Sequence, residues 1–238
     1  MESLKGKNVV LIGASGGIGE KTAKLLAGSG ANLCITGRDM LKLKAVADMA
    51  NIPVTQVFEM DLADELSVKN SFTLIQAQMP VIDILVNAAG VGIIKPMETL
   101  SAAEFRLSLN TNLVGVFYLM QSVLPGMKEQ KKGLIINIPG VLGKVPMAGA
   151  AAYSASKFGL VGMMQSIREE IKRTEIRITN LFLGGVDSPF WDQIDLRVQR
   201  DKMVIAEEAA KAIWFLCQQP RSGVVSEMVL QPFNHQAI

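Results

Sequence analysis

A buried strand that runs directly into a glycine-rich turn and then into a helix opens this sequence, and no other feature limits the possible folds as much. Residues 9–12 (Val-Val-Leu-Ile) show no polar alternation, which is typical of a parallel strand covered on both faces. Residues 13–19 then read Gly-Ala-Ser-Gly-Gly-Ile-Gly. From there Ile18, Thr22 and Leu26 recur every four residues, as on the buried face of an amphipathic helix. Strand, turn and helix in this order predict an α/β unit.

Short apolar runs and longer helical patterns continue to alternate along the chain. This alternation predicts a single α/β domain of Rossmann type over residues 1–238, with a doubly wound, seven-stranded, mostly parallel sheet and helices on both faces. In such a sheet a ligand binds at the carboxyl edge of the strands. The expected strands are 9–12, 32–36, 53–58, 82–86, 133–138, 176–183 and 225–230. The expected helices are 17–29, 39–50, 62–78, 101–129, 152–173 and 205–218.

The distribution of charge and apolar residues excludes several classes of partner. The 24 basic and 22 acidic residues are spread along the chain without a basic block, so we expect no nucleic-acid partner. No uncharged apolar run approaches the roughly 18 residues that span a bilayer, and the N-terminus shows no export signal. We therefore expect a cytoplasmic protein with no membrane partner.

The cysteines and the histidine give little support for metal or nucleophilic chemistry. Cys34 and Cys217 lie in apolar segments without a spacing motif, which predicts buried thiols in a reducing compartment. The only histidine, His235, lies four residues from the end and is expected in a solvated tail. The sequence therefore predicts no metal site and no Ser-His-Asp triad.

The glycines of the first turn have the properties that a dinucleotide phosphate site requires. Gly13 can adopt a tight turn, Gly17 lets the backbone approach a pyrophosphate, and Gly19 lets strand and helix pack closely. The helix that begins here offers free N–H groups and a positive dipole end to phosphates. Glycines also serve ordinary turns, but a position between a buried strand and an amphipathic helix favours cofactor binding. The predicted phosphate-binding residues are Gly13, Ser15, Gly16, Gly17, Ile18 and Gly19.

Further motifs follow this turn in a fixed order. The turn has the spacing G-x-x-x-G-x-G; later come Asp61-Leu62, Asn87-Ala88-Ala89-Gly90, Asn112, and Tyr153 four residues before Lys157. Together, over nearly the whole chain, they resemble the motifs of the short-chain dehydrogenase/reductase family. The resemblance implies a nicotinamide dinucleotide and hydride transfer to or from a small carbonyl or alcohol substrate. The cofactor contacts that it implies beyond the turn are Asp61, Leu62, Asn87, Ala88, Ala89, Gly90, Tyr153, Lys157, Gly184, Val186 and Ser188.

The end of the second expected strand favours NADP(H) over NAD(H). Members of the family that prefer NAD carry a carboxylate for the ribose 2′-hydroxyl, and the matching position here is Gly37. Arg38 follows, and its planar guanidinium suits a 2′-phosphate. The alternative is that Arg38 is only solvated beside Asp39, which would cap the next helix. Gly16 is a point against NADP(H), because many NADP-preferring members have Arg or Lys there.

Tyr153 and Lys157 are the predicted catalytic pair. They are four residues apart on an expected helix, so their side chains share a face. A tyrosine with a pKa near 10 needs a nearby cation to act as an acid or base at neutral pH, and Lys157 supplies it. The resemblance adds Asn112 as the residue that positions a water linked to Lys157. The alternative is a chance pair on a solvated helix.

One position departs from the family at the reaction centre. The resemblance places a catalytic serine thirteen residues before the tyrosine, where this chain has Gly140 in the sequence Ile138-Pro139-Gly140. The loss of one donor to a developing oxyanion typically costs about 100- to 1,000-fold in rate. We therefore keep two hypotheses: an oxidoreductase of reduced activity, and a catalytically weak or inactive dinucleotide-binding sensor or regulatory protein. A serine restored at position 140 is expected to raise turnover if the backbone permits it.

Apolar segments are expected around the substrate. They are residues 91–94, 141–147 and 187–204, and the last contains Phe190 and Trp191, which either line the cavity or pack a lid. The sequence therefore predicts an apolar carbonyl or alcohol substrate.

Small residues recur at helical spacing in the expected helix 152–173, at Ala155, Gly159, Gly162 and Ser166. They pack either on the chain's own sheet or on another subunit. The family resemblance favours the subunit contact and a homodimer or homotetramer.

Overall fold

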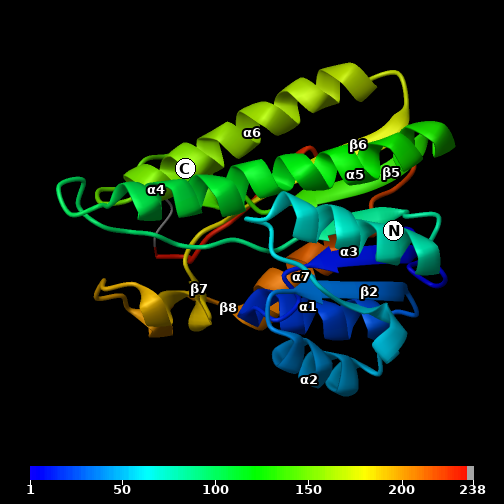
Figure 1. The fold of residues 1–238 in the computed structure, drawn as a ribbon, viewed down its shortest axis with the longest axis horizontal. Coiled ribbons are helices and arrows are strands. Elements are labelled where there is room, and N and C mark those ends of the chain that lie inside the picture. Colours follow the sequence, from blue (N-terminus) through cyan, green and yellow to red (C-terminus); the bar gives the residue numbers. More distant parts are fainter. Residues whose placement is uncertain (235–238) are drawn as a thin grey trace.

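The computed structural model describes residues 1–234, which form a seven-stranded, entirely parallel sheet (Figure 1). The strand order is β3-β2-β1-β4-β5-β6-β9. The first three strands are added outward from β1 in one direction, and the later strands are added from β4 in the other, so the winding reverses between β1 and β4. The predicted Rossmann-type fold is confirmed. The strands are β1 Asn8–Ile12, β2 Asn32–Gly37, β3 Val57–Glu59, β4 Ile84–Asn87, β5 Lys132–Asn137, β6 Glu175–Leu183 and β9 Glu227–Leu230.

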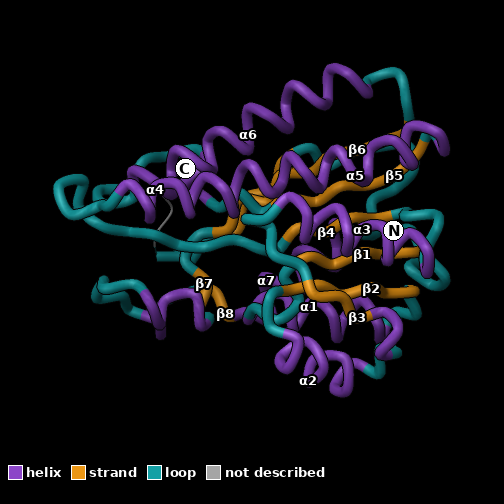
Figure 2. Tube along the Cα trace, viewed as in Figure 1, coloured by secondary structure: helices purple, strands orange, loops and turns teal. Residues whose placement is uncertain are grey.

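Helices cover both faces of the sheet, as Figure 2 shows. One apolar core lies against α1, α2 and α7, and a second lies against α3, α5 and α6. Val9 and Leu11 of β1 point into the first core while Val10 and Ile12 point into the second, which explains why this strand has no polar alternation. The helices are α1 Gly17–Gly28, α2 Met40–Ala50, α3 Glu65–Gln78, α4 Ala102–Leu109, α5 Gly115–Gln130, α6 Ala151–Ile171 and α7 Ala206–Leu216.

Both cysteines are buried free thiols, as predicted. Cys34 lies in the core on the α3 side and Cys217 in the core on the α7 side. Burial raises the pKa of the Cys34 thiol to about 11 and that of Cys217 to about 12, so neither is a reactive thiolate at neutral pH. His235 lies outside the described residues.

The structure corrects two sequence-based boundaries and adds two short strands that the sequence did not predict. The expected strand 53–58 starts as a 3₁₀ turn at Val54–Gln56, because Pro53 removes a backbone donor at the sheet edge, and only β3 follows. The helix expected from residue 62 begins after Asp64, whose side chain accepts from the Leu66 N–H. Two short strands, β7 Val186–Asp187 and β8 Val204–Ile205, pair outside the main sheet.

The segment expected as one helix over 101–129 contains a π-helical turn at Asn110–Val114 between α4 and α5. Within residues 1–234, only Ala102–Gln130 is long and apolar enough to cross a membrane. It is a core helix here, since Val116, Leu119 and Val123 are buried against the sheet.

The small residues of α6 do not pack on the chain's own sheet. Ala155, Gly162 and Ser166 are exposed, and Gly159 lies against Leu113 of the π-helical turn. The sheet-facing side of α6 carries larger residues instead. The alternative that explained this seam by internal packing is therefore wrong, and the face is open in the isolated chain.

Candidate functional site

The site lies at the carboxyl edge of the sheet, where β1 and β4 are neighbours and the winding of the chain reverses. The turns after these two strands touch. Gly13 has φ +82°, and a Cβ there would lie 2.7 Å from the backbone of Ala89. The sequence predicted both turns as cofactor-binding segments, and the structure brings them together where a dinucleotide binds in doubly wound folds.

The start of α1 is packed too closely for any side chain at Gly19. A Cβ at this position would lie 2.1 Å from the Gly13 carbonyl oxygen and 2.8 Å from the Cα of Ala14. This is the close strand–helix packing that the glycine spacing predicts. It holds the N-terminus of α1 directly over the end of β1.

The N-terminus of α1 carries unused hydrogen-bond donors. Within residues 1–234, the N–H groups of Gly17, Ile18 and Gly19 have no acceptor, and the N-cap residue Gly16 provides no side-chain cap. Free N–H groups at a helix N-terminus attract anions. A Cβ at Gly16 would meet only the Gly13 carbonyl oxygen, at 3.4 Å, so this side of the turn is open. The turn therefore fits the pyrophosphate of a dinucleotide.

The turn after β2 carries an exposed cation, Arg38, next to a closely packed glycine. A Cβ at Gly37 would lie 2.7 Å from the Ser15 Oγ. Arg38 is exposed, and its guanidinium has no partner in the part of the chain that the structure describes. Asp39 caps α2 by accepting from the Lys42 N–H at 3.0 Å, as the alternative for this turn proposed. Arg38 is not paired with it and remains available.

Hydrogen bonds hold the two other predicted cofactor turns. The Asp61 carboxylate accepts from the Ala63 N–H at 2.9 Å, and Leu62 is buried beneath Gly115 at the start of α5. In the turn after β4, Asn87 donates to Asn137 of β5 at 3.2 Å and accepts from the Ala89 N–H at 3.3 Å.

Tyr153 and Lys157 come together on the first turns of α6. The Lys157 ammonium lies 5.4 Å from the centre of the Tyr153 ring and donates to the Ile138 carbonyl at 3.1 Å. Lys157 is 3% exposed, and burial lowers its pKa to about 8. Burial also raises the pKa of Tyr153. The pair is therefore a protonated phenol beside an amine that titrates just above neutrality.

Asn112 lies in the π-helical turn, a feature that occurs frequently at functional sites. Its Oδ1 accepts from the Val91 N–H at 2.8 Å, and its Nδ2 donates to the Val91 carbonyl at 2.9 Å. A Cβ at Gly90 would lie 3.1 Å from the Asn112 Oδ1 and 3.4 Å from the Lys157 Nζ. The turn after β4, Asn112 and Lys157 thus form one cluster.

Gly140 occupies the place beside Tyr153 that the family resemblance gives to a serine. A Cβ at Gly140 would lie 4.0 Å from the Tyr153 hydroxyl and 3.4 Å from the Leu183 carbonyl oxygen. There is space for a side chain, but the backbone has φ +70° and ψ 169°, a conformation that favours glycine. The backbone conformation at position 140 therefore itself favours glycine over serine.

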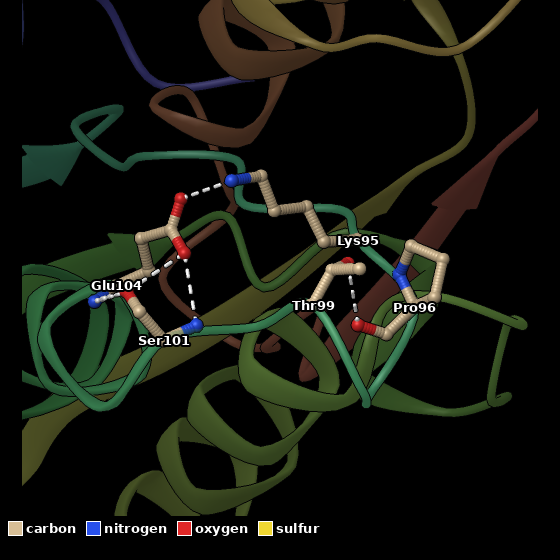
Figure 3. Close-up of polar contacts among 5 residues, drawn as sticks. All are labelled: Lys95, Pro96, Thr99, Ser101 and Glu104. Carbon is tan, nitrogen blue, oxygen red and sulfur yellow. Dashed lines mark hydrogen bonds and ion pairs between the residues drawn. The ribbon is translucent and has the colours of Figure 1, made fainter.

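The loop after β4 forms one rim of the site through Ile94, and Figure 3 shows the contacts that hold the C-terminal part of this loop. The Ser101 hydroxyl and the Glu104 carboxylate form a capping box at the start of α4, and Lys95 forms an ion pair with Glu104. These partners hold the pKa of Glu104 well below its usual value, at about 2. The Lys95 N–H also donates to the Gly149 carbonyl at 2.7 Å, which connects the loop to the segment before α6.

The segment between β7 and β8 forms the opposite rim. The end of the Phe190 ring occupies the position where a Gly92 side chain would be, since its Cζ lies 2.2 Å from a Cβ placed at Gly92, and the ring lies 5.9 Å from that of Tyr153. Trp191 packs edge-on against Phe190 and donates to the Val186 carbonyl at 2.9 Å. Both interpretations of these aromatic residues hold, because they line the cavity and form part of the segment that covers it.

Arg200 fixes this segment. It forms ion pairs with Asp187 and Asp192 and donates to the Ser188 carbonyl at 3.0 Å. Ser188 in turn lies against the phosphate turn, since a Cβ at Gly17 would be 3.0 Å from the Ser188 Cβ. The segment therefore connects the cofactor turn to the substrate side.

A cavity of about 560 Å³ opens beside Tyr153. Its walls are mostly apolar, as the sequence predicts. They come from the segment after β5, the start of α6, the segment between β7 and β8, and the C-terminal residues after β9. The lining includes Ile94, Gly140, Val141, Leu142, Val145, Met147, Tyr153, Gly184, Phe190, Trp191, Lys202, Met203 and Pro232.

Sequence analysis did not identify Asn137, Arg200 or the contact of Phe190 with Gly92. A polar residue at the end of an apolar strand was a usable signal for Asn137. Arg200 and Phe190 have no local pattern that marks them. Among the described residues, no group of three or more His, Cys, Asp or Glu side chains is placed to hold a metal ion.

Comparison with known sequences gives consistent matches along the chain. A family model described as short chain dehydrogenase matches residues 7–198. An uncharacterized oxidoreductase of Staphylococcus saprophyticus is 32% identical over 237 residues, covering 98% of this chain and 100% of its own length. One from Staphylococcus epidermidis is 29% identical over 232 residues, with the same coverage.

Solved structures match over nearly the same extent. A metagenomic short-chain oxidoreductase in complex with NADP is 31% identical, with a TM-score of 0.83 over 97% of this chain and 99% of that one. The closed form of a serine dehydrogenase complexed with NADP⁺ is 25% identical, with a TM-score of 0.87 over 96% of both chains.

Proposed function

This chain belongs to the short-chain dehydrogenase/reductase family and is an NAD(P)-binding oxidoreductase, and from that premise we propose that it interconverts a small apolar carbonyl compound and its alcohol with NADP(H). The observation that carries the proposal is Tyr153 in the wall of an apolar cavity, with Lys157 beside it and the cofactor turns next to it. When bound, NADP(H) supplies or accepts the hydride.

In the direction of reduction, Tyr153 donates its proton to the substrate oxygen as negative charge develops there. The raised pKa of Tyr153 keeps it protonated until that moment. Lys157 carries a charge below about pH 8 and stabilises the phenolate that remains. Asn112 positions a water that exchanges protons with Lys157. In oxidation the same residues act in reverse.

Two observations support NADP(H) over NAD(H). Position 37 carries no carboxylate, a side chain there would displace the Ser15 hydroxyl, and the exposed Arg38 has no partner within residues 1–234. In addition, the metagenomic relative and the serine dehydrogenase were both solved with NADP or NADP⁺. Arg38 is therefore proposed to bind the 2′-phosphate.

The predicted cofactor residues divide along the crevice. The phosphate turn 13–19 holds the pyrophosphate, and Asp61 and Leu62 flank the adenine. The turn 87–90 adjoins the nicotinamide ribose together with Lys157. Gly184, Val186 and Ser188 come from the segment after β6, on the nicotinamide side.

Gly140 favours a second candidate function. With no hydroxyl at this position, the chain has one donor fewer for the substrate oxygen, and its φ of +70° shows that the backbone is adapted to glycine. A dinucleotide-binding sensor or regulatory protein requires only the cofactor turns. The presence of both Tyr153 and Lys157 supports the enzyme.

The assembly and location follow as further proposals. The exposed small-residue face of α6, at Ala155, Gly162 and Ser166, supports a homodimer or homotetramer formed through this helix. We place the protein in the cytoplasm and treat residues 1–238 as one catalytic domain, because both apolar cores share one sheet.

Fluorescence titration of NADPH and NADH at one salt concentration tests the cofactor. NADPH is expected to bind more tightly, and Arg38→Asp is expected to reverse the order. Equal affinities in the unmutated protein contradict this assignment. A panel of aldehydes and ketones with NADPH then tests the reaction, and binding without turnover of any carbonyl or alcohol favours the sensor.

A further inference from the structure

We propose that the substrate carries a carboxylate at the far end of its apolar body and that Lys202 recognises this group. The proposal rests on the proposed function and narrows its substrate class. It begins from the charge of the cavity wall. Among the described lining residues only Lys202 is a charged residue; the others are apolar, glycine, amide or the Tyr153 phenol. A lone cation in such a wall selects an anionic partner.

Lys202 is an exposed residue of this wall, and its ammonium is free within residues 1–234. It has no ion pair or hydrogen bond to any of residues 1–234, whereas Arg200, two residues earlier, is bound by two carboxylates and a carbonyl. Arg200 is therefore engaged in holding the segment together, whereas Lys202 makes no contact of this kind. A lysine that served only to anchor the segment would be expected to have a partner of this kind.

The backbone that carries Lys202 is held on both sides. The Lys202 N–H donates to the Gln199 carbonyl at 3.1 Å, and the Val204 N–H donates to the Gly185 carbonyl at 3.0 Å. Met203 packs on Gly185, with its Cγ 3.3 Å from a Cβ placed there. The backbone from which the Lys202 side chain extends is therefore held in place.

Tyr153 and Lys202 belong to different walls of the cavity. Tyr153 lies on α6, while Lys202 lies in the segment between β7 and β8, which is gold in Figure 1 and lies across the site from the first turns of α6. A substrate with its carbonyl at Tyr153 and an apolar middle along Val141, Leu142 and Met203 would present its other end to Lys202. That arrangement corresponds to an oxo acid or hydroxy acid with its two functional groups at opposite ends of an apolar body.

The lone lysine favours a carboxylate over a phosphate. Phosphate groups are typically held by the planar fork of arginine or by several donors and cations. Arg200 is occupied by its two carboxylates, and the remaining polar lining residues are amides. A single ammonium matches a single negative charge.

A binding experiment tests the proposal without any turnover. Hexanoate, hexanamide and hexyl phosphate are titrated while tryptophan fluorescence is followed, because Trp191 lies in the cavity wall. Hexanoate is expected to bind about tenfold more tightly than hexanamide. Lys202→Met should abolish the difference and Lys202→Arg should keep it. Lys24→Met, which removes an exposed lysine of α1, is the control and should change nothing.

Equal affinities of hexanoate and hexanamide in the unmutated protein overturn the proposal, and so does a preference that survives Lys202→Met. Tighter binding of hexyl phosphate than of hexanoate overturns the assignment to a carboxylate.

Steady-state kinetics with NADPH distinguish a failure of the Lys202 assignment from a failure of the proposed reaction. Lys202→Met should raise the KM for 5-oxohexanoate about tenfold and leave 2-hexanone unchanged. Selective binding of hexanoate without turnover of any carbonyl refutes the proposed reaction and leaves the recognition by Lys202 standing.

Discussion

Two glycines with positive φ, Gly13 after β1 and Gly140 after β5, show how differently the two halves of the site are built. A side chain at Gly13 would collide with the backbone of Ala89 at 2.7 Å, whereas a Cβ at Gly140 would make only ordinary contacts, at 3.4 Å with the Leu183 carbonyl oxygen and 4.0 Å with the Tyr153 hydroxyl. The cofactor side is thus made of backbone segments that pack so closely that only glycine fits at positions such as 13 and 19. The reaction side depends on side chains around a cavity, and one of these can be lost without loss of the fold.

The same contrast appears in the polar groups. On the cofactor side the functional groups are free N–H groups of Gly17, Ile18 and Gly19, which need no side chain. On the reaction side they are the side chains of the partly buried Tyr153 and the buried Lys157, whose pKa values are shifted by burial. Substitutions on the cofactor side should therefore affect folding and cofactor binding, and substitutions on the reaction side should affect the rate of the chemical step.

The largest effect is expected for Tyr153→Phe. The loss of the proton-transfer hydroxyl should lower kcat by about 10²- to 10⁴-fold, while the Kd for NADPH changes by less than about twofold. Lys157→Met should weaken both, because Lys157 adjoins the cofactor turn. Steady-state kinetics and fluorescence titration give the two quantities. Full activity of the Tyr153→Phe variant would show that the acid lies elsewhere and would remove the contrast between the two sides.

A methyl group at Gly19 should damage the cofactor side. Gly19→Ala places a Cβ 2.1 Å from the Gly13 carbonyl oxygen, so the free energy of unfolding should fall by about 3 kcal/mol or more. Gly28→Ala, at the other end of α1, is the matched control, because nothing lies within 4 Å of its Cβ. It should raise stability by about 0.4–1 kcal/mol. Urea unfolding of both variants makes the comparison, and equal effects would contradict the packing argument.

Lys157 should make the stability of the protein depend on pH. Its pKa is about 8 in the folded chain and near 10.5 when unfolded, so between these values the unfolded state binds more protons. The free energy of unfolding should therefore rise through this window, by up to about 3 kcal/mol from this group. Urea titrations at pH 7 and pH 10 should show the rise in the unmutated protein and its loss in Lys157→Met. The same rise in both proteins would assign it to other groups.

The smallest effect is expected at Gly140, where the gain in rate from an added hydroxyl is opposed by the backbone strain that any side chain brings. Gly140→Ser adds a hydroxyl near Tyr153 but places a side chain at φ +70° and ψ 169°, which costs roughly 1–3 kcal/mol of stability. Gly140→Ala bears the same strain without the hydroxyl. Turnover by the serine variant should exceed that of the alanine variant several-fold, while their unfolding midpoints agree. Identical turnover would show that the missing hydroxyl does not limit the reaction.

Local sequence patterns were sufficient to predict much of the fold of this protein. The unalternating run 9–12 and the glycine spacing predicted the first strand, the phosphate turn and the α/β class, and the i,i+4 spacing of Tyr153 and Lys157 placed both on one helix face. Boundaries were less accurate where a single residue decides them, as at Pro53 and Asp64. The π-helical turn at Asn112 has no periodic signal, because it lies inside a continuous helix.

By itself the sequence determined the alternation of strands and helices, the position of the glycine turn and the placement of Tyr153 and Lys157 on one helix, because these depend on residues within one or two turns of each other. Only the tertiary structure decided that Gly13 abuts Ala89, that Phe190 fills the space at Gly92, and that Gly140 has a positive φ. It also decided that Arg200 forms ion pairs with two carboxylates while Lys202 has no such partner within residues 1–234. These are contacts between segments far apart in the chain, or backbone angles imposed by packing. Their energies depend on how the whole sheet and its covering segments fit together, which no local pattern records.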